Sequence, residues 1–207
     1  MDRTKLSAIL AGVVAVAFLV ASAGYVLLGR SASEFAECGG GSVAGGSIGG
    51  PFELIDETGA VVTDKDVLDK PALVYFGYTF CPDVCPFDMA RNVEAVEILT
   101  SQGYDVRPVF ISIDPERDTP EVVAEWTDYL HPDLIGLTGS AEQVKAASQA
   151  YRTYYKKQEG DEEFYLVDHS VFTYLMLPET GFADFFGRDV SAAEMADKAA
   201  CFIDASR

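Results

Sequence analysis

The feature that most constrains the fold is an alternation of strand-like apolar runs and helix-start signals after Pro51. Ala72–Phe76 is a continuous apolar run with β-branched and aromatic members, as in strands buried on both faces. Val106–Ile113 indicates a second buried strand. Thr119-Pro120 combines an N-cap residue with a proline at the first helical position, and Ser140–Gln143 is a capping box. The pattern therefore predicts an α/β domain.

The rest of the domain continues this alternation. Further expected strands are Phe52–Ile55, Leu134–Leu137 and a hairpin made by Val171–Leu177 and Phe182–Phe186. Expected helices cover residues 86–100, 119–130, 140–154 and 191–204. From Ala72 onward the order is β-α-β-α-β-α-β-β-α, which predicts a mixed central sheet with helices on both faces, and the thioredoxin-like fold is the named architecture that fits it best.

The N-terminal region predicts a membrane segment. Leu6–Leu28 carries no charge and is long enough to cross a hydrocarbon core of ~30 Å as a helix. Arg3 and Lys5 precede it, so the positive-inside rule places the N-terminus in the cytoplasm. We expect residues 1–30 to form one N-terminal transmembrane helix, with a cleaved signal peptide ending near Ala23 as the alternative. Residues 31–50 then form a Gly/Ser-rich linker, and residues 51–207 form the domain.

This topology predicts a single-pass protein of the cytoplasmic (inner) membrane of a bacterium, with the domain facing the periplasm. The formal net charge of the chain is −18. So acidic a surface argues against binding to nucleic acid and to anionic lipid headgroups. It would attract cations or a basic protein partner, and it also promotes solubility.

Two cysteines, Cys81 and Cys85, lie between a predicted buried strand and a predicted helix, within the run Tyr75–Pro86. Each precedes a proline, which disfavours the α region, so we expect Cys85 at the N-cap of the helix and Pro86 as its first residue. A thiolate at a helix N-terminus is stabilised and its pKa is lowered. Such a pair either binds a soft metal or cycles between dithiol and disulfide.

A third ligand decides between these two chemistries, and His169 is the candidate. Two thiolates and one imidazole suit Cu(I) and are acceptable for Cu(II), whereas structural zinc takes four ligands. Asp168 would either support the imidazole from behind or cap the strand. The other histidine, His131, precedes Pro132 at an expected helix end and is interpreted as a surface residue.

Other residues leave alternatives open. Cys38 and Cys201 would form a disulfide in an oxidising compartment, or remain two unrelated thiols. Asp114 and Pro115 follow a strand and either line the site or shape the loop. The aromatic residues at 151–155 and 182–186 are interpreted as packing, with a docking face for a partner as the alternative.

Three motifs together resemble the Sco/SenC family of copper-binding assembly proteins: Tyr75–Pro86, Ile111–Pro120 and Val167–Ser170. The resemblance extends from about Pro51 to the C-terminus. It implies a thioredoxin-like domain that binds copper through Cys81, Cys85 and His169. It also implies a role in building the dinuclear CuA centre of cytochrome c oxidase subunit II, with an upstream copper donor or a thiol reductant as a further partner. Cys38 and Cys201 are not part of the family pattern.

The leading hypothesis is therefore a metallochaperone, which passes copper on without turnover in the enzymatic sense. The alternative is a thiol–disulfide oxidoreductase with Cys81 and Cys85 as its redox-active pair, which would keep the CuA-site cysteines reduced. A copper or redox sensor would use the same ligands. The run Tyr75–Phe80 does not match the motif that precedes a peroxiredoxin cysteine.

Overall fold

The computed structural model describes residues 12–13, 16–18, 22, 35, 37–39, 48–161 and 164–207. Most of the predicted transmembrane helix in residues 1–30 and most of the predicted linker lie outside these residues. Among the residues that are described, no helix is both long enough and apolar enough to cross a membrane.

Within the described residues, seven strands form one mixed sheet in the order β2-β1-β5-β4-β3-β8-β9. Strand β3 runs parallel to β4, and β4 runs parallel to β5, whereas β1 and β8 pair antiparallel with their neighbours. This confirms the predicted mixed sheet. The strands are β1 (Glu53–Asp56), β2 (Val61–Thr63), β3 (Ala72–Gly77), β4 (Arg107–Ser112), β5 (Ile135–Thr138), β8 (Thr173–Leu177) and β9 (Gly181–Phe186).

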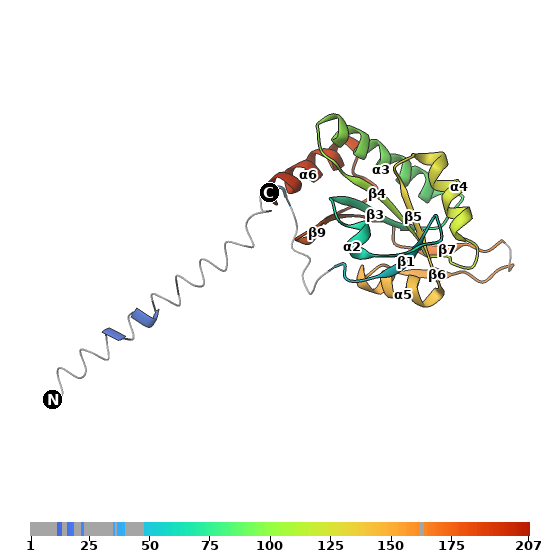
Figure 1. Ribbon diagram of the computed structural model, residues 1–207, viewed down its shortest axis with the longest axis horizontal. Coiled ribbons are helices and arrows are strands. Elements are labelled where there is room, and N and C mark those ends of the chain that lie inside the picture. Colours follow the sequence, from blue (N-terminus) through green and yellow to red (C-terminus); the bar gives the residue numbers. More distant parts are fainter. Residues whose placement is uncertain are drawn as a thin grey trace. The chain divides into compact units, whose positions relative to one another are not determined.

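Helices cover both faces of this sheet, as predicted. Helices α3, α4 and α6 lie on one face, and α5 lies on the other (Figure 1). The helices are α2 (Asp64–Val67), α3 (Val84–Ser101), α4 (Pro120–Leu130), α5 (Ala141–Ala150) and α6 (Ala192–Ala205).

The capping signals set where three of these helices begin. Thr119, Ser140 and Ser191 are the N-caps of α4, α5 and α6, and each side chain accepts a hydrogen bond from a first-turn N–H. These three predicted starts are confirmed. Helix α5 ends at Ala150, four residues before its expected end.

The strand register brings three loops to one edge of the sheet. Strand β3 is buried along its whole length, and its last residue Gly77 pairs with Ser112 at the end of β4. Because β8 is antiparallel to β3, with Thr173 opposite Tyr75, the segment before β8 lies near the carboxyl end of β3. The loops after β3 and β4 and the segment before β8 therefore converge, at the edge where α/β sheets place their sites.

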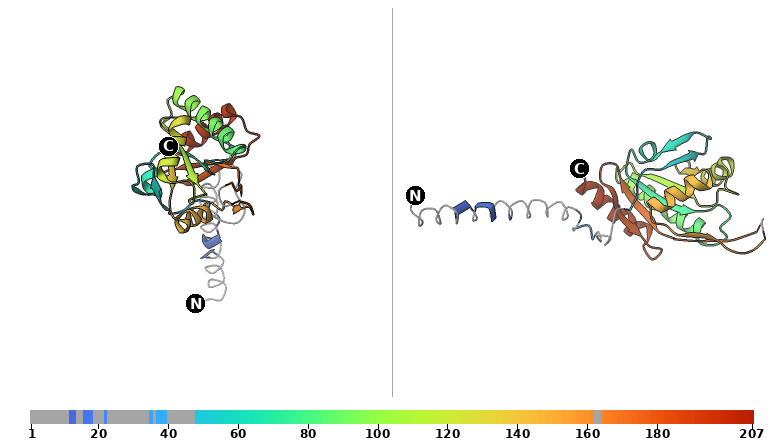
Figure 2. Two further views of the ribbon diagram at one scale, coloured as in Figure 1. Left: turned by 90° about the vertical axis from the view of Figure 1, so that its right-hand side faces the viewer. Right: turned by 90° about the horizontal axis from the view of Figure 1, so that it is seen from below.

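A second, two-stranded ribbon was not expected from the sequence. It consists of β6 (Tyr155–Lys157) and β7 (Val167–His169), with Tyr155 opposite His169. In Figure 2 this orange ribbon extends from the body of the domain. Sequence reasoning identified His169 only as a residue near the start of a strand, whereas the structure places it on an antiparallel pair of its own.

Candidate metal centre

The two cysteines occupy the junction between β3 and α3. Cys81 lies in the turn after β3, and Cys85 is the second residue of α3, whose N-cap is Asp83. The prediction that Cys85 is the N-cap was therefore wrong. The helix starts earlier because Pro86 still lies in its first turn, where backbone N–H groups have no helical partner and a proline loses nothing.

The sulfur of Cys81 takes the role of a capping acceptor. Asp83 makes no capping hydrogen bond with its side chain, and the Cys85 N–H donates to Cys81 Sγ at 3.5 Å. A helix N-terminus favours negative charge, because its free N–H groups and its dipole point toward the acceptor. The start of α3 thus stabilises a thiolate at Cys81.

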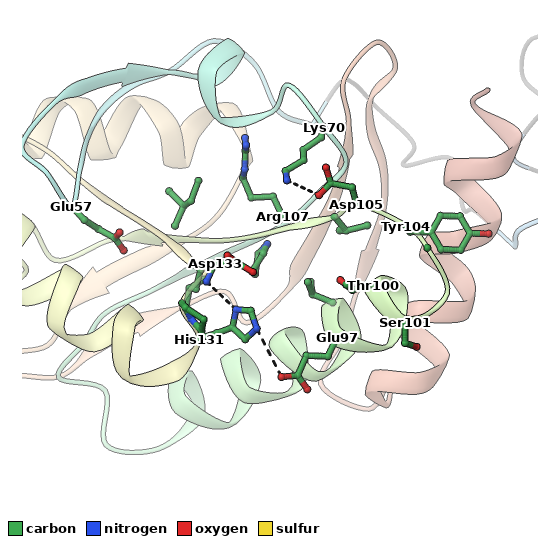
Figure 3. A pocket seen from close by; sticks show the side chains of 17 residues that line it. Glu57, Lys70, Glu97, Thr100, Ser101, Tyr104, Asp105, Arg107, His131 and Asp133 are labelled. Carbon is green, nitrogen blue, oxygen red and sulfur yellow. Dashed lines mark hydrogen bonds and ion pairs between the residues drawn. The ribbon is translucent and has the colours of Figure 1, made fainter.

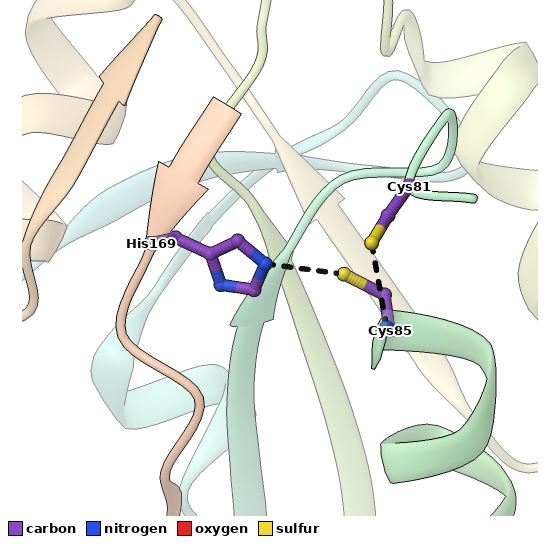
Figure 4. Close-up of side chains that lie close together, drawn as sticks. All are labelled: Cys81, Cys85 and His169. Carbon is purple, nitrogen blue, oxygen red and sulfur yellow. Dashed lines mark hydrogen bonds between the residues drawn. The ribbon is translucent and has the colours of Figure 1, made fainter. Parts of the chain in front are cut away.

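Figure 4 shows the imidazole of His169, on β7, pointing toward the two sulfurs. His169 Nε2 lies 3.4 Å from Cys85 Sγ. The three potential ligand atoms lie within 4.8 Å of one another, the only such cluster of potential metal ligands in the described residues. Nitrogen and sulfur ligands of zinc lie about 2.0–2.3 Å from the ion, so two ligands of one such ion can be up to about 4.6 Å apart. Small side-chain adjustments would let all three reach a single ion.

The orientation of the imidazole is set by the main chain. His169 Nδ1 lies 2.8 Å from the carbonyl oxygen of Ser170, so this nitrogen carries the proton and Nε2 keeps its lone pair for the sulfurs. The rings of Tyr75 and Tyr78 pack edge-on against the imidazole, with centroid distances of 6.2 and 5.8 Å. Together these contacts aim Nε2 at the cysteines.

Asp168 does not take the role of supporting the imidazole. Its carboxylate accepts a hydrogen bond from Gln158 Nε2 at 2.6 Å, and Gln158 follows β6. Asp168 therefore links the two sides of the ribbon that carries His169, and the Ser170 carbonyl occupies the position behind the ring. A main-chain acceptor leaves no signal in the sequence.

The two thiols are buried and differ in their acidity. Cys85 has no exposed surface and Cys81 is 8% exposed. The hydrogen bond from the Cys85 thiol lowers the pKa of Cys81 against the opposing effect of burial, and the N–H groups of Cys85 and Asp83 lower it further. The same sulfur–sulfur hydrogen bond, together with burial, raises the pKa of Cys85. Cys81 is thus the thiolate of the metal-free pair, and Cys85 holds the remaining proton.

A buried carboxylate that sequence reasoning missed holds in place the cysteine loop, which is residues 78–83 between β3 and α3. Asp118 accepts hydrogen bonds from the Thr79 N–H at 3.0 Å, the Thr79 hydroxyl at 2.6 Å and the Ser112 hydroxyl at 2.5 Å. It thereby joins the segment before Cys81 to the end of β4. Burial raises the pKa of Asp118, although the three hydrogen bonds act in the opposite direction. Asp118 lies inside the run Ile111–Pro120 that carried the resemblance, but nothing in the run marks it as a loop anchor.

Arg117 connects the cysteine loop to the segment before β7. Its Nε donates to Asp114 Oδ2 at 2.6 Å, and another guanidinium nitrogen donates to the Tyr165 carbonyl at 3.1 Å. The guanidinium also lies over two aromatic rings, 3.6 Å from the Tyr165 centroid and 4.9 Å from the Phe80 centroid. Asp114 accepts a further hydrogen bond, from the Tyr165 hydroxyl at 2.6 Å. Asp114 therefore shapes the loop, which is one of the two roles that the sequence left open for it.

His131 lies apart from the cysteines, as interpreted from the sequence. It is the C-cap of α4, and its Nδ1 accepts a hydrogen bond from the Asp133 N–H at 3.1 Å. Its Nε2 is 3.9 Å from Glu97, in a cleft that also holds the ion pair of Lys70 and Asp105 (Figure 3). The contacts of His131 thus lie at the C-terminal end of α4.

The other open alternatives are resolved in part. Cys38 and Cys201 are each disulfide-bonded, whereas Cys81 and Cys85 are free thiols. Tyr151 packs against Phe76 with a centroid distance of 5.1 Å and belongs to the buried core. The packing interpretation is therefore confirmed for this aromatic residue.

Comparison with known proteins gives a family model and a curated relative that agree with each other. The family model described as SCO1/SenC matches residues 41–204. The protein SenC of Rhodobacter capsulatus is 51% identical over 208 residues, which cover 99% of this chain and 94% of that protein.

Two solved structures extend these matches to the fold. The crystal structure of Arabidopsis thaliana ScoI with copper bound is 45% identical, with a TM-score of 0.73, and covers 76% of this chain and 99% of that chain. The structure of Bradyrhizobium japonicum ScoI with copper bound is 36% identical, with a TM-score of 0.69, and covers 75% and 99%. The thioredoxin-like α/β fold expected from the sequence is therefore shared with these proteins.

Proposed function

The chain belongs to the SCO1/SenC family, and from this premise we propose that it binds copper through Cys81, Cys85 and His169 and passes it on during assembly of cytochrome c oxidase. The recipient in this proposal is the CuA site of subunit II. The single observation that carries the proposal is the convergence of two sulfurs and one imidazole nitrogen within 4.8 Å.

The donor set fits copper as cargo better than it fits other ions. Two thiol sulfurs and one imidazole nitrogen are soft ligands, and Cu(I) accepts three of them without a fourth. Copper is present in two solved relatives of this chain. The lone pair of Nε2 faces the sulfurs already, so metal binding requires loss of only the remaining thiol proton on Cys85.

The first test is a Cu(I) titration of the full chain, read by competition with a Cu(I) chelator. The wild type is expected to bind one Cu(I), and His169→Ala is expected to weaken binding by about tenfold or more, because one of three ligands is lost. His131→Ala is the matched control, since His131 is the other of the two histidines in the chain and lies at a helix end.

Three outcomes decide this test. Weaker binding in His169→Ala, with unchanged binding in His131→Ala, supports the proposed ligand set. Equal affinity in the wild type and His169→Ala removes the third ligand and favours redox chemistry at the cysteines. Equal losses in both histidine variants would point to a general effect of histidine removal and would contradict the proposed site.

Thiol–disulfide exchange is a second candidate function, and one observation favours it. Cys81 and Cys85 are free thiols in hydrogen-bonding contact, and one of them is held as a thiolate. Attack of the Cys81 thiolate on a disulfide of the recipient would form a mixed disulfide and release one recipient thiolate. Attack by Cys85 would then release the second and leave a Cys81–Cys85 disulfide. A metal-free protein that reduces an oxidised CuA-domain peptide at a useful rate, with His169→Ala equally active, would support this function over copper delivery.

We also propose that residues 1–30 anchor the chain in the cytoplasmic membrane with the domain in the periplasm. The support is the uncharged run Leu6–Leu28 behind Arg3 and Lys5. Fractionation of cells that express the full chain, or the chain without residues 1–30, tests this. The full chain should sediment with membranes and resist carbonate extraction, and its domain should be open to protease in spheroplasts. Release of the intact domain in soluble form would favour the cleaved signal peptide instead.

A further inference from the structure

A hollow of about 640 Å³ opens directly beside the cysteine loop. Its walls come from Thr79 and Phe80, which immediately precede Cys81, and from one side of α4. The residues of α4 that line it include Trp126, Tyr129 and two acidic residues. The hollow is therefore continuous in the chain with the proposed copper site, although none of its lining residues is a proposed ligand.

Three aromatic side chains line this hollow, and two of them are unusually exposed. Tyr129 is 89% exposed and Phe80 is 53% exposed. Trp126 is partly buried, and its ring packs on Phe110 with a centroid distance of 4.4 Å, which fixes its position. Aromatic side chains, Tyr and Trp above all, are enriched in protein–protein interfaces, and here three of them line one hollow.

The hollow also carries negative charge. Glu125 and Asp128 line it from α4, both are exposed, and neither is in an ion pair within the described part of the chain. Aromatic rings with neighbouring carboxylates form the set of groups that binds a cation, through the ring faces and through charge. Phe80 already has the guanidinium of Arg117 over its ring at 4.9 Å.

We propose that this hollow, lined by Phe80, Trp126, Tyr129, Glu125 and Asp128, binds an arginine side chain of the partner protein that docks at Cys81 and Cys85. An arginine fits best, because its planar guanidinium stacks on aromatic rings and pairs with carboxylates, whereas a lysine ammonium is more strongly hydrated. The net charge of −18 would also draw a basic segment to this surface. The position of the arginine next to the thiols of the partner rests on the proposed function, whereas binding of the side chain to the hollow does not.

The hollow contains a built-in reporter, because Trp126 is the only tryptophan of the chain. Titration of the metal-free full chain with N-acetyl-arginine methylamide should give a saturable change in tryptophan fluorescence at millimolar concentrations. The matched probe is N-acetyl-citrulline methylamide, which has nearly the same shape but no charge, and it should bind at least severalfold more weakly.

Variants then locate the binding. Glu125→Gln/Asp128→Asn is expected to lower the affinity for the arginine probe about three- to tenfold, and Tyr129→Ala is expected to lower it by a similar factor. Glu142→Gln/Glu179→Gln removes the same charge elsewhere, from two exposed side chains, and should leave affinity unchanged. Because the protein is metal-free, a failure here leaves the copper proposal untouched, and a failure of copper binding leaves this one untouched.

The proposal is overturned by any of three results. The first is the absence of a saturable fluorescence change with the arginine probe. The second is equal binding of the citrulline probe, which would make the hollow a site for neutral side chains. The third is an equal loss in Glu142→Gln/Glu179→Gln, which would make the effect one of net charge alone.

Discussion

At the scale of single residues, Gly77 leaves the space in which the Cys85 sulfur lies. A Cβ atom built at position 77 would lie 3.0 Å from Cys85 Sγ and 2.9 Å from a ring carbon of Tyr75. Both neighbours are buried and cannot move aside into solvent. The absence of a side chain at the end of β3 therefore makes room for the sulfur.

Gly77→Ala is expected to displace Cys85 and to lower Cu(I) affinity by about tenfold or more, with a loss of about 1–3 kcal/mol in the free energy of unfolding from overpacking. Chelator competition and thermal unfolding measure the two effects. Gly50→Ala is the control, because a Cβ at position 50 meets only Ala150 at an ordinary 3.5 Å. Unchanged copper affinity in Gly77→Ala would show that the sulfur position tolerates the added methyl group.

The unequal acidity of the two thiols gives a second prediction at this scale. Because the pKa of Cys81 is lowered and that of Cys85 is raised, Cys81 should be a thiolate well below pH 9 while Cys85 stays protonated. Iodoacetamide should modify Cys81 first in the reduced, metal-free protein. Its rate should stay flat as pH falls from 8 to 6, whereas an ordinary thiol slows about tenfold per pH unit. Peptide mapping after short labelling would detect the opposite order, which would contradict the assignment.

At the scale of elements, the sequence predicted the sheet and most helices but not the ribbon that carries His169. Strands such as Ala72–Gly77 are detectable because burial on both faces demands continuous apolar residues. Strand β6, Tyr155–Lys157, is short and largely exposed, so neither alternation nor apolar length marks it. The same limit applies to Asp118 and Ser170, whose roles depend on backbone positions that only the fold defines.

The ribbon predicts that the position of His169 can be loosened without unfolding the domain. The Gln158 N–H donates to the Leu166 carbonyl at 2.8 Å, and its side chain donates to Asp168. Gln158→Pro removes both bonds and should weaken Cu(I) binding about three- to tenfold, because each lost hydrogen bond is worth about 1 kcal/mol. The melting temperature should change little, since β6 and β7 are not part of the seven-stranded sheet.

Gln158→Ala separates the two contributions, because it loses only the side-chain bond to Asp168. It should fall between the wild type and Gln158→Pro in copper affinity. A large drop in melting temperature with Gln158→Pro would mean that the ribbon supports the whole domain. The loss of copper affinity would then reflect unfolding, and the prediction of a local effect on His169 would be contradicted.

At the scale of the whole molecule, the four cysteines divide into two classes. Cys81 and Cys85 are free, and Cys38 and Cys201 are disulfide-bonded. Sequence reasoning left this division open, because pairing depends on distance in the folded chain and Cys38 and Cys201 lie far apart in the sequence. The disulfide also agrees with an oxidising compartment such as the periplasm.

Alkylation of the denatured protein without reductant, followed by mass spectrometry, should label Cys81 and Cys85 and leave Cys38 and Cys201 protected. Cys38→Ser/Cys201→Ser should lower the free energy of unfolding by about 2–4 kcal/mol, because a disulfide that closes a long loop restricts the unfolded chain. Copper affinity should not change in that variant. Labelling of all four cysteines in protein prepared without reductant would rule out the disulfide.

The hydrogen bond between His169 Nδ1 and the Ser170 carbonyl has a consequence for how this family can vary. Every residue type offers the same carbonyl, so replacement of Ser170 by another amino acid leaves the tautomer of the neighbouring ring intact. What such a replacement removes is the hydrogen bond that the Ser170 hydroxyl accepts from the Tyr154 N–H at 3.0 Å, so a protein engineer who wishes to reverse the ring must move the backbone itself.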